Sequence, residues 1–362
     1  MSPDPKDTDP DDPRPTMPAD SDCCGTGCEP CVFDLYDRDL AAWKRRRLGA
    51  GSGAGSSVDP AAAPLDQQEF RPFVAARVHL SPPGPHAHPR SLVSLVEFDD
   101  LSSARLGPSL TGPAAIGAPG NRHVWLRPSL GDPSRQYTPF WWPGPDGRPR
   151  VYLYCKTAPE SAMSRGIAAA GAGTALPLRG VSATPSSLCL SPNKFQRVTL
   201  LAAGSGIAAC LQILSSILLN DRDDTMLDLV WAVRDDQAEI VALPALLDIL
   251  AAMSEYVTLR PHLVVSSVPL AESGAGPAPD PGHGRLGRIF RSVTRGQRLD
   301  QDLLLGQGPV ARMLGLAAAK RPALTRGREA AFLCGPATFT REMRRVLVDV
   351  AGWPAEQVEE AN

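Results

Sequence analysis

Short runs of alternating apolar and polar residues dominate the first half of the chain. Each run is rich in β-branched or aromatic residues and is bounded by proline or glycine, which is typical of strands joined by turns. Because many short strands at close spacing are characteristic of a closed antiparallel sheet, we predict a small antiparallel β-barrel over residues 69–192. The predicted strands cover residues 73–80, 91–98, 123–127, 135–140, 150–156 and 175–181.

The pattern changes at residue 193, where longer apolar runs follow one another. A strand over 195–203 leads into Gly204-Ser205-Gly206 and a helix over 207–220. Strands that alternate with helices form βαβ units. We therefore predict a doubly wound α/β domain over residues 193–362, with a parallel sheet covered by helices on both faces. Its remaining elements are strands over 227–233, 262–267 and 330–333 and a helix around 242–253.

The first 68 residues predict three shorter units. Residues 1–20 form an acidic, proline-rich tail that cannot fold alone, and residues 49–68 form a linker rich in glycine, serine and alanine. Between them lies a cysteine-rich module over residues 21–48, which ends in an amphipathic helix over 32–44. The predicted fold class is an α+β multidomain chain: this small module, an antiparallel β-barrel and an α/β domain.

Four thiols stand close together in the cysteine-rich module. Cys23, Cys24, Cys28 and Cys31 are separated by small residues that allow the backbone to wrap around one centre. Thiolates at this spacing bind zinc or an iron-sulfur cluster. A redox-active thiol pair and a disulfide-prone tail are the alternatives. The six histidines add no ligand pattern, and the other cysteines, which are Cys155, Cys189, Cys210 and Cys334, are expected to be reduced thiols in apolar surroundings.

Composition and charge narrow the functional classes. The 362 residues carry a formal net charge of -2, which offers no general basis for binding nucleic acid. The longest apolar stretch, residues 200–219, is interrupted by glycine, serine and glutamine, so no transmembrane segment is expected. The acidic start of the chain fits neither a signal peptide nor a transit peptide. We expect an intracellular protein, with the cytoplasm as the favoured compartment and the mitochondrion as the alternative.

One motif in the barrel half combines three kinds of chemistry. Arg135-Gln136-Tyr137-Thr138-Pro139 places a guanidinium, an aromatic ring and a hydroxyl within four residues. The guanidinium can donate two parallel bonds to a phosphate, and the ring can lie against a heterocycle. In a strand, Arg135 and Tyr137 point to one face and Thr138 to the other. The alternative is an ordinary edge strand that ends at a proline.

Two turns in the α/β half follow predicted strands. Gly204-Ser205-Gly206 stands between a strand and a helix, where small residues allow a pyrophosphate to reach the amides of the helix N-terminus. A nucleophilic serine needs glycines at other positions and is excluded. Cys334-Gly335-Pro336 ends the last strand with a sharp turn, so the thiol either lines the crevice or packs in the core.

The order of these motifs resembles the ferredoxin-NADP reductase superfamily, and within it the NADH-cytochrome b5 reductases. The matching residues are Arg135-Gln136-Tyr137-Thr138-Pro139, then Met163-Ser164, then the glycine turn and Cys334-Gly335-Pro336. The cysteine-rich segment is similar to the short oxidoreductase-like domain, which some cytochrome b5 reductase-like proteins carry. The resemblance implies that the barrel binds FAD and that the α/β domain binds the nicotinamide nucleotide. It covers nearly all of the chain from Asp22 to Glu356.

The resemblance also implies roles for individual residues. Arg135 would bind the FAD pyrophosphate, Tyr137 would pack against the flavin, and Thr138 with Pro139 would contact the isoalloxazine. Met163 and Ser164 would hold the FAD phosphate, and Lys156 would serve the pyridine nucleotide. The nucleotide would be cradled by Gly204, Ser205 and Gly206, while Cys334, Gly335 and Pro336 would lie where hydride passes to the flavin. Thr138 and Cys334 are therefore the expected catalytic residues.

The sequence departs from the family pattern in several places. Glu160-Ser161-Ala162 replaces a Gly-Gly-Lys before Met163, and Val268 replaces the acid that selects NADH over NADPH. Arginines crowd the region from Arg285 to Arg298; they form a solvated basic surface or meet a 2'-phosphate or an acidic cytochrome.

We therefore expect an FAD-dependent oxidoreductase that oxidises NADH, with NADPH as an alternative. It would pass single electrons to a haem protein such as cytochrome b5. The rival hypothesis is a non-catalytic reductase scaffold whose working part is the metal or iron-sulfur centre on the amino-terminal cysteines. The lost glycines motivate that rival, together with Ala209 where the family has a proline after the glycine turn and Ala337-Thr338 where it has two prolines after Cys-Gly-Pro.

Overall fold

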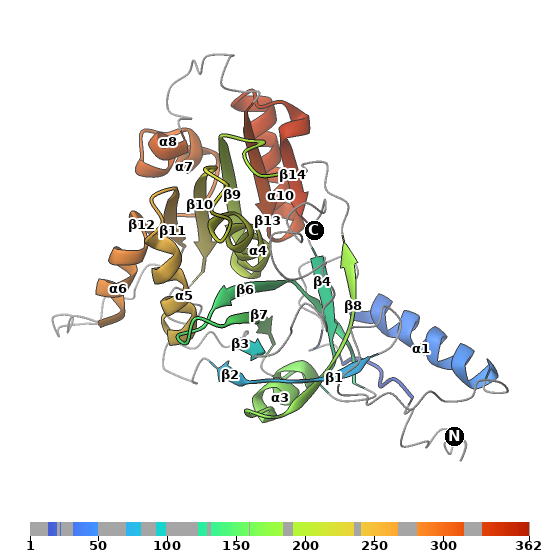
Figure 1. The fold of residues 1–362 in the computed structure, drawn as a ribbon. Helices are drawn as coiled ribbons and strands as arrows, with labels where there is room; N and C mark the ends of the chain where they lie inside the picture. Colours follow the sequence, from blue (N-terminus) through green and yellow to red (C-terminus); the bar gives the residue numbers. More distant parts are fainter. Residues whose placement is uncertain are drawn as a thin grey trace, which may run out of the picture.

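The structure is a computed structural model that describes residues 14–19, 22, 32–49, 70–80, 92–98, 122–128, 132–158, 160–183, 191–234, 240–266, 281–314 and 328–361. Two parts are visible in Figure 1: a lower part of antiparallel strands and an upper part built on a parallel sheet. Helix α1 (Val32–Gly49) lies beside the lower part. The four amino-terminal cysteines, Cys189 and Val268 are outside the described residues.

The antiparallel part consists of two four-stranded sheets. One sheet has the order β1 (Arg71–Val74), β8 (Ala175–Ala183), β4 (Arg122–Leu126), β5 (Arg135–Tyr137). The other has the order β2 (Arg77–Leu80), β3 (Leu92–Phe98), β7 (Pro149–Thr157), β6 (Pro139–Pro143). The two sheets share one apolar core, to which α3 (Ala162–Ala169) adds Met163 and Ile167. The predicted antiparallel strands are confirmed.

Two of the predicted strands are divided between the sheets. The predicted run over 135–140 becomes β5 in one sheet and β6 in the other, with only Thr138 between them. The run over 73–80 divides in the same way into β1 and β2. Periodicity alone cannot show that a strand passes from one sheet to the other, because the alternation of apolar and polar residues continues through the bend.

The upper part is a six-stranded parallel sheet with the order β12-β11-β10-β9-β13-β14. Strand β9 (Arg197–Ala203) lies between β10 (Met226–Val233) and β13 (Glu329–Cys334), so the order of the strands reverses at β9. In such sheets, ligands bind at the carboxyl ends of the strands where the order reverses. The outer strands are β11 (Leu259–Val265), β12 (Ser292–Arg295) and β14 (Val358–Ala361).

Helices cover both faces of the parallel sheet, which confirms the predicted doubly wound arrangement. Helices α4 (Ile207–Leu218), α5 (Pro244–Ser254) and α6 (Pro281–Ile289) contribute to a core that also includes residues of β3, β6 and β7 from the antiparallel part. On the other face lie α7 (Gln301–Leu305), α8 (Pro309–Leu314), α10 (Ala337–Arg345) and the π-helix η6 (Val346–Val350). Two short 3-10 turns complete the part, η4 (Gly204–Gly206) and η7 (Ala355–Gln357).

One apolar cluster joins the two parts. Phe140, Trp142 and Tyr154 of the antiparallel part share it with α4 and with Trp231 of β10. The Tyr154 and Trp231 rings meet edge to face, with centroids 6.4 Å apart, and Trp142 meets Tyr256 in the same way at 6.1 Å. In addition, Gln212 Nε2 of α4 donates a 2.6 Å hydrogen bond to the carbonyl oxygen of Pro139. The relative position of the two parts is therefore fixed by a continuous core.

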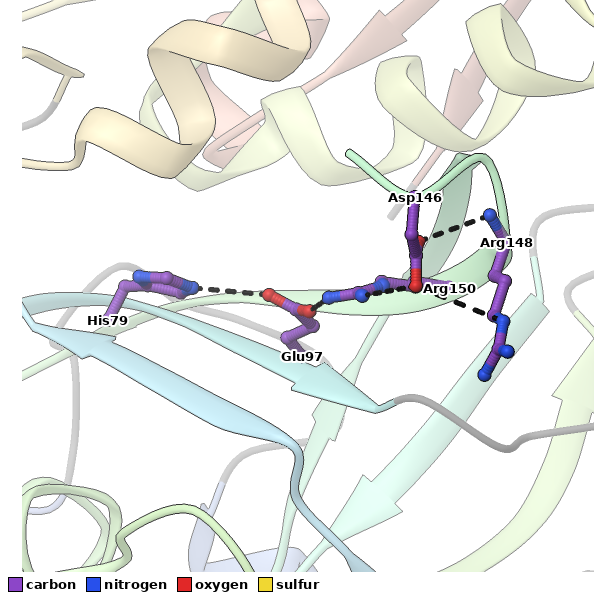
Figure 2. A network of polar contacts seen from close by, with 5 residues as sticks. All are labelled: His79, Glu97, Asp146, Arg148 and Arg150. Atoms are coloured by element: carbon purple, nitrogen blue, oxygen red, sulfur yellow. Dashed lines mark hydrogen bonds and ion pairs between the residues drawn. The ribbon is translucent and has the colours of Figure 1, made fainter. Parts of the chain in front are cut away.

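A polar network holds the hairpin between β6 and β7 (Figure 2). The buried Glu97 carboxylate accepts a bond from Arg150 Nη1 and lies 3.2 Å from His79 Nε2. Arg150 also donates to Asp146 at 3.1 Å, and Asp146 accepts from the Arg148 amide in the turn. Because a buried carboxylate needs a cation and hydrogen bonds, Arg150 ties the centre of the sheet to the turn.

Helix α1 is attached to the antiparallel part through a buried carboxylate. Asp39 is 6% exposed and accepts bonds from Arg127 Nη2 at 2.7 Å, from Arg179 Nη1 at 3.1 Å and from Ser134 Oγ at 2.9 Å. The two guanidinium groups also lie over the Phe70 ring, 4.0 and 4.8 Å from its centroid, where the ring face attracts cations. Sequence periodicity predicts a helix here, but its key contact is an acid on the buried side.

None of the helices within the described ranges has the combined length and apolar character that a bilayer crossing requires.

Replacing Asp39 by asparagine tests this attachment. The variant leaves two buried guanidinium groups opposite a neutral amide, and removing one partner of a buried ion pair costs about 3 kcal/mol. We expect Asp39→Asn to lower the urea midpoint of unfolding, measured by tryptophan fluorescence. Asp37→Asn, an exposed site on the same helix, is the matched control. Equal midpoints for the two variants would contradict the role given to Asp39.

Candidate functional site

Two glycine turns meet at the carboxyl ends of β9 and β13. A Cβ atom on Gly206 would lie 2.2 Å from the carbonyl oxygen of Cys334. A Cβ atom on Gly335 would lie 2.9 Å from the Cβ atom of Ala203. Gly204 has a φ of +52°, in the left-handed region that favours glycine. The turns that the sequence predicts separately are therefore packed against each other, where the strand order reverses.

The antiparallel part reaches this same place through β7. The nearest side-chain atom to a Cβ on Gly204 would be Lys156 Nζ, at 3.8 Å. Trp231 Nε1 donates a 3.0 Å bond to the Gly204 carbonyl, and Tyr154 packs on Trp231. A cation from one part thus stands beside the glycine turn of the other, as a site for an anionic nucleotide requires.

Arg135 and Tyr137 point to the inner side of the antiparallel part. The Tyr137 ring is 9% exposed and lies in the core with Val124 and Leu126. Burial raises the pKa of the Tyr137 hydroxyl well above its usual value, so it stays protonated. The Tyr137 hydroxyl lies beside the Cys155 thiol, which interacts with it. Among the described residues, the buried Arg135 Nη2 has no hydrogen-bond partner, and such an atom is costly unless a further group satisfies it.

Thr138 points to the opposite face, as the alternation predicts, and meets a histidine. Its hydroxyl lies 2.9 Å from Nδ1 of His123, and both side chains are buried. Burial lowers the pKa of His123 to about 4, so the ring is neutral at neutral pH. A neutral ring can either accept the hydroxyl proton or donate one to the oxygen, depending on its tautomer. His123 is therefore a buried, neutral partner of Thr138, and the sequence analysis assigned it no such contact.

Met163 and Ser164 lie in the first turn of α3. Met163 packs in the core, and the Ser164 hydroxyl contacts Thr157, Ser161 and the carbonyl of Ala158. Ser161 is the N-cap and accepts a 3.1 Å bond from the Ser164 amide, so the departure from Gly-Gly-Lys has a local structural role. The Ala162 amide donates to the carboxylate of Asp22, 2.9 Å away.

Cys334 is half-buried at the end of β13. Burial raises the pKa of its thiol to about 12, so the thiol is neutral at neutral pH. It also lies close enough to the buried Cys210 of α4 to contribute to the raised pKa of that thiol. A neutral thiol presents a small, weakly polar surface next to Gly335 and carries no charge to the site.

Several residues of the site give no signal in the sequence. His123, Asp22 and Trp231 reach the site through strand register or through contacts between distant segments. Only Ser161 has a local signature, because a serine three residues before the Ser164 amide is a common N-cap. Within the described ranges, no group of three or more histidine, cysteine or acidic residues is placed to hold a metal ion. The predicted metal ligands lie outside those ranges.

The residues present fit a bound flavin nucleotide in one respect. The Arg135 guanidinium keeps a buried nitrogen, Nη2, that lacks a hydrogen-bond partner. A diphosphate supplies acceptors of the kind that this group needs.

Substituting Gly206 tests the packing of the two turns. In Gly206→Ala the methyl group would overlap the Cys334 carbonyl, so the turns must separate, and overpacking of this kind costs about 1–3 kcal/mol. We expect a clear fall in the thermal midpoint. Gly287→Ala, on α6 with open space around it, should leave the midpoint unchanged or raise it. A Gly206→Ala variant as stable as Gly287→Ala would argue against the close contact.

The buried histidines make stability depend on pH. The pKa values of His123 and His262 are both lowered from 6.5 to about 4, mainly by burial. The unfolded chain therefore binds more protons between pH 6.5 and 4, and stability falls as the pH drops through this window. Each histidine contributes on the order of 3 kcal/mol. We expect His123→Asn to flatten part of this slope in thermal unfolding at pH 7 to 4; an unchanged slope would contradict the burial effect.

Comparisons with known proteins show what this chain is similar to. A family model described as "Oxidoreductase-like protein, N-terminal" matches residues 10–51. The human protein named NADH-cytochrome b5 reductase-like is 26% identical over 341 residues, which cover 92% of this chain and 90% of the human one. A mouse protein of the same name is 28% identical over 219 residues, or 60% of this chain and 64% of the mouse one.

Among solved structures, the cytochrome b5 reductase domain of Ulva prolifera nitrate reductase aligns with a TM-score of 0.50 at 17% identity. The alignment covers 83% of this chain and all of that domain. At this identity the likeness concerns the fold, and it supports the combination of antiparallel sheets with a parallel sheet. The expected resemblance is confirmed: the chain is similar to the NADH-cytochrome b5 reductase-like proteins, and its residues 10–51 match the oxidoreductase-like amino-terminal family.

Proposed function

We propose that the protein is an FAD-dependent oxidoreductase that oxidises NADH or NADPH and passes electrons to an acceptor of the cytochrome b5 type. One observation carries the proposal: Lys156 of the antiparallel part stands beside Gly204, where that glycine turn packs against Cys334 and Gly335. A nucleotide in these turns would lie against the antiparallel part, which is the arrangement that transfer between two bound nucleotides needs. The names of the relatives support an oxidoreductase.

The flavin would be held beside the antiparallel part, at the partly buried Arg135. Arg135 Nη2 would donate to the diphosphate, and the first turn of α3 at Met163 and Ser164 would face the phosphates. Tyr137, which lies in the core beside Cys155, would support this strand from the inside. Bound FAD supplies the redox chemistry, because it accepts a hydride and releases electrons singly. The task of the protein is to hold the two nucleotides in contact and to exclude water.

Thr138 and His123 would control one hydrogen bond to the flavin ring. Because the histidine is neutral and sits 2.9 Å from the hydroxyl, the hydroxyl can turn its proton toward the ring or away from it. Thr138 can therefore act as a donor or an acceptor without a charge being created in a buried place. Cys334, also neutral, would pack against the nicotinamide without repelling it.

The nucleotide would lie over the carboxyl ends of the parallel strands. Arg295 ends β12 opposite Val265, and Arg234 follows the end of β10. Arginines in this position suit a 2'-phosphate, so we propose that NADPH is accepted beside NADH. Exposed arginines near α6, among them Arg288, Arg291 and Arg298, form a surface that an acidic acceptor protein would meet. The zinc or iron-sulfur centre on Cys23, Cys24, Cys28 and Cys31 also remains a proposal.

Flavin binding is tested by removing the predicted phosphate ligand. Loss of charge-assisted hydrogen bonds costs roughly 1.5–3 kcal/mol, so Arg135→Leu should weaken FAD binding about 10- to 100-fold in titrations of the apoprotein. Arg148→Leu, in the neighbouring turn with an 84% exposed side chain, should leave the affinity unchanged. A colourless wild-type protein that takes up no FAD would refute the proposal and would favour the non-catalytic scaffold.

Nucleotide choice is tested by steady-state kinetics with an artificial acceptor. We expect kcat/KM for NADPH and NADH to differ by less than about tenfold, and Arg295→Ala to lower the NADPH value about tenfold, since one lost charged contact is worth about 1.4 kcal/mol. The NADH value should change little, and Arg148→Ala, at a side chain that is 84% exposed in the turn between β6 and β7, should affect neither. Equal losses for both nucleotides would show that Arg295 does not read the 2'-phosphate.

A further inference from the structure

The indole of Trp231 is hydrogen-bonded to the glycine turn after β9. Trp231 lies in β10 opposite Ala202, two residues before Gly204. Alternation along β10 directs Trp231 to the face of the sheet that α4 covers, where it joins the apolar core. The ring is 0% exposed, and its Nε1 donates a 3.0 Å hydrogen bond to the Gly204 carbonyl. A buried indole N–H needs an acceptor, and this acceptor belongs to the candidate nucleotide site.

The Gly204 carbonyl oxygen uses both of its acceptor positions within the protein. Besides the indole, it accepts a bond from the Ile207 amide, which closes the 3-10 turn. A carbonyl oxygen has two lone pairs. Gly204 adopts this orientation with a φ of +52°, which glycine tolerates best. The oxygen is therefore directed toward β10 and α4 and has no acceptor position left for a ligand.

The orientation of this oxygen also sets the orientation of the next amide. In a trans peptide the C=O and N–H bonds point in opposite directions. Because the Gly204 oxygen faces the buried indole, the Ser205 amide faces the other way, and Ser205 itself is exposed. Rotation of this peptide would exchange the two groups and present an acceptor to the ligand. An anion needs donors and is repelled by the negative end of a carbonyl dipole.

The indole is itself held by the antiparallel part. The Tyr154 ring meets Trp231 edge to face at 6.4 Å. Tyr154 and Lys156 are two residues apart in β7 and share one face of that strand. Lys156 Nζ would lie 3.8 Å from a Cβ atom on Gly204. One strand face thus supports the indole with an aromatic ring and places a cation beside the turn that the indole fixes.

We propose that Trp231 is a positioning residue for nucleotide binding: its indole N–H holds the Gly204 carbonyl away from the ligand and keeps the Ser205 amide directed toward the nucleotide diphosphate. The inference rests on the proposed function, in which NADH or NADPH lies at this turn. Trp231 is fully buried and acts through Gly204. Because both nucleotides carry the same diphosphate, the contribution of Trp231 is equal for both.

The first test removes the donor and keeps an aromatic ring against Tyr154. We expect Trp231→Phe to raise KM for NADH and for NADPH by the same factor, about three- to tenfold, which corresponds to one neutral hydrogen bond. A loss of uniform binding leaves kcat unchanged, and the FAD affinity should also stay the same. Trp142→Phe is the matched control, because Trp142 is buried in the same core but meets Tyr256; its KM values should equal those of wild type.

A second measurement needs no turnover. ADP-ribose carries the diphosphate without the nicotinamide, and calorimetric titration of the full-length, FAD-loaded protein should show about three- to tenfold weaker binding to Trp231→Phe. Without any nucleotide, hydrogen exchange at the Ile207 amide should be faster in Trp231→Phe than in Trp142→Phe, because Ile207 donates to the same carbonyl.

A second variant separates the hydrogen bond from the size of the ring. Replacing Trp231 by β-(3-benzothienyl)alanine keeps the two fused rings and substitutes sulfur for the N–H group, so this variant should match Trp231→Phe. Wild-type affinity in the benzothienyl variant would assign the effect to ring volume and overturn the positioning role. Wild-type KM and ADP-ribose affinity in both variants would also overturn it and leave the proposed function standing. A wild-type protein that binds neither FAD nor NADH would overturn both.

Discussion

The packing of α4 against β6 and β7 is the interaction on which the candidate site depends. This apolar core is continuous from Phe140 and Tyr154 to Trp231 and α4. The hydrogen bond from Gln212 to Pro139 fixes the position of α4 along β6. Because a closely packed core transmits small displacements, the position of Lys156 relative to Gly204 is set by these contacts. The residues that the two parts contribute to the site keep a fixed relative position because the two parts share this core.

Buried acids form the second level of organisation. Asp39, Glu97 and Asp228 are each almost fully buried, and each is paired with at least one arginine. Each pair connects segments that are distant in sequence: α1 with β8, β3 with β7, and β9 with β10 and β11. Such pairs add little net stability over apolar residues of similar volume, but breaking one is costly. They therefore specify which segments meet.

The expected motifs differ in how much of their surroundings could be predicted. The two glycine turns follow from strand-to-helix patterns, and their closeness follows from the doubly wound topology once β9 and β13 are neighbours. The pairing of Thr138 with His123 could not be predicted, because it depends on the register of β4 against β5. Likewise, the inward position of Tyr137 depends on the turn of the chain from β5 to β6 at a single residue.

The amino-acid sequence alone determined the element types, the antiparallel and parallel halves and the motif Arg135-Gln136-Tyr137-Thr138-Pro139, because these depend on local periodicity and on chemistry within a few residues. Only the tertiary structure decided what each motif touches. It placed Lys156 beside Gly204, closed α3 with Asp22 and enclosed Asp39 between two arginines. These contacts join residues that are far apart in the chain. They stabilise the protein only after packing has removed the interacting groups from water.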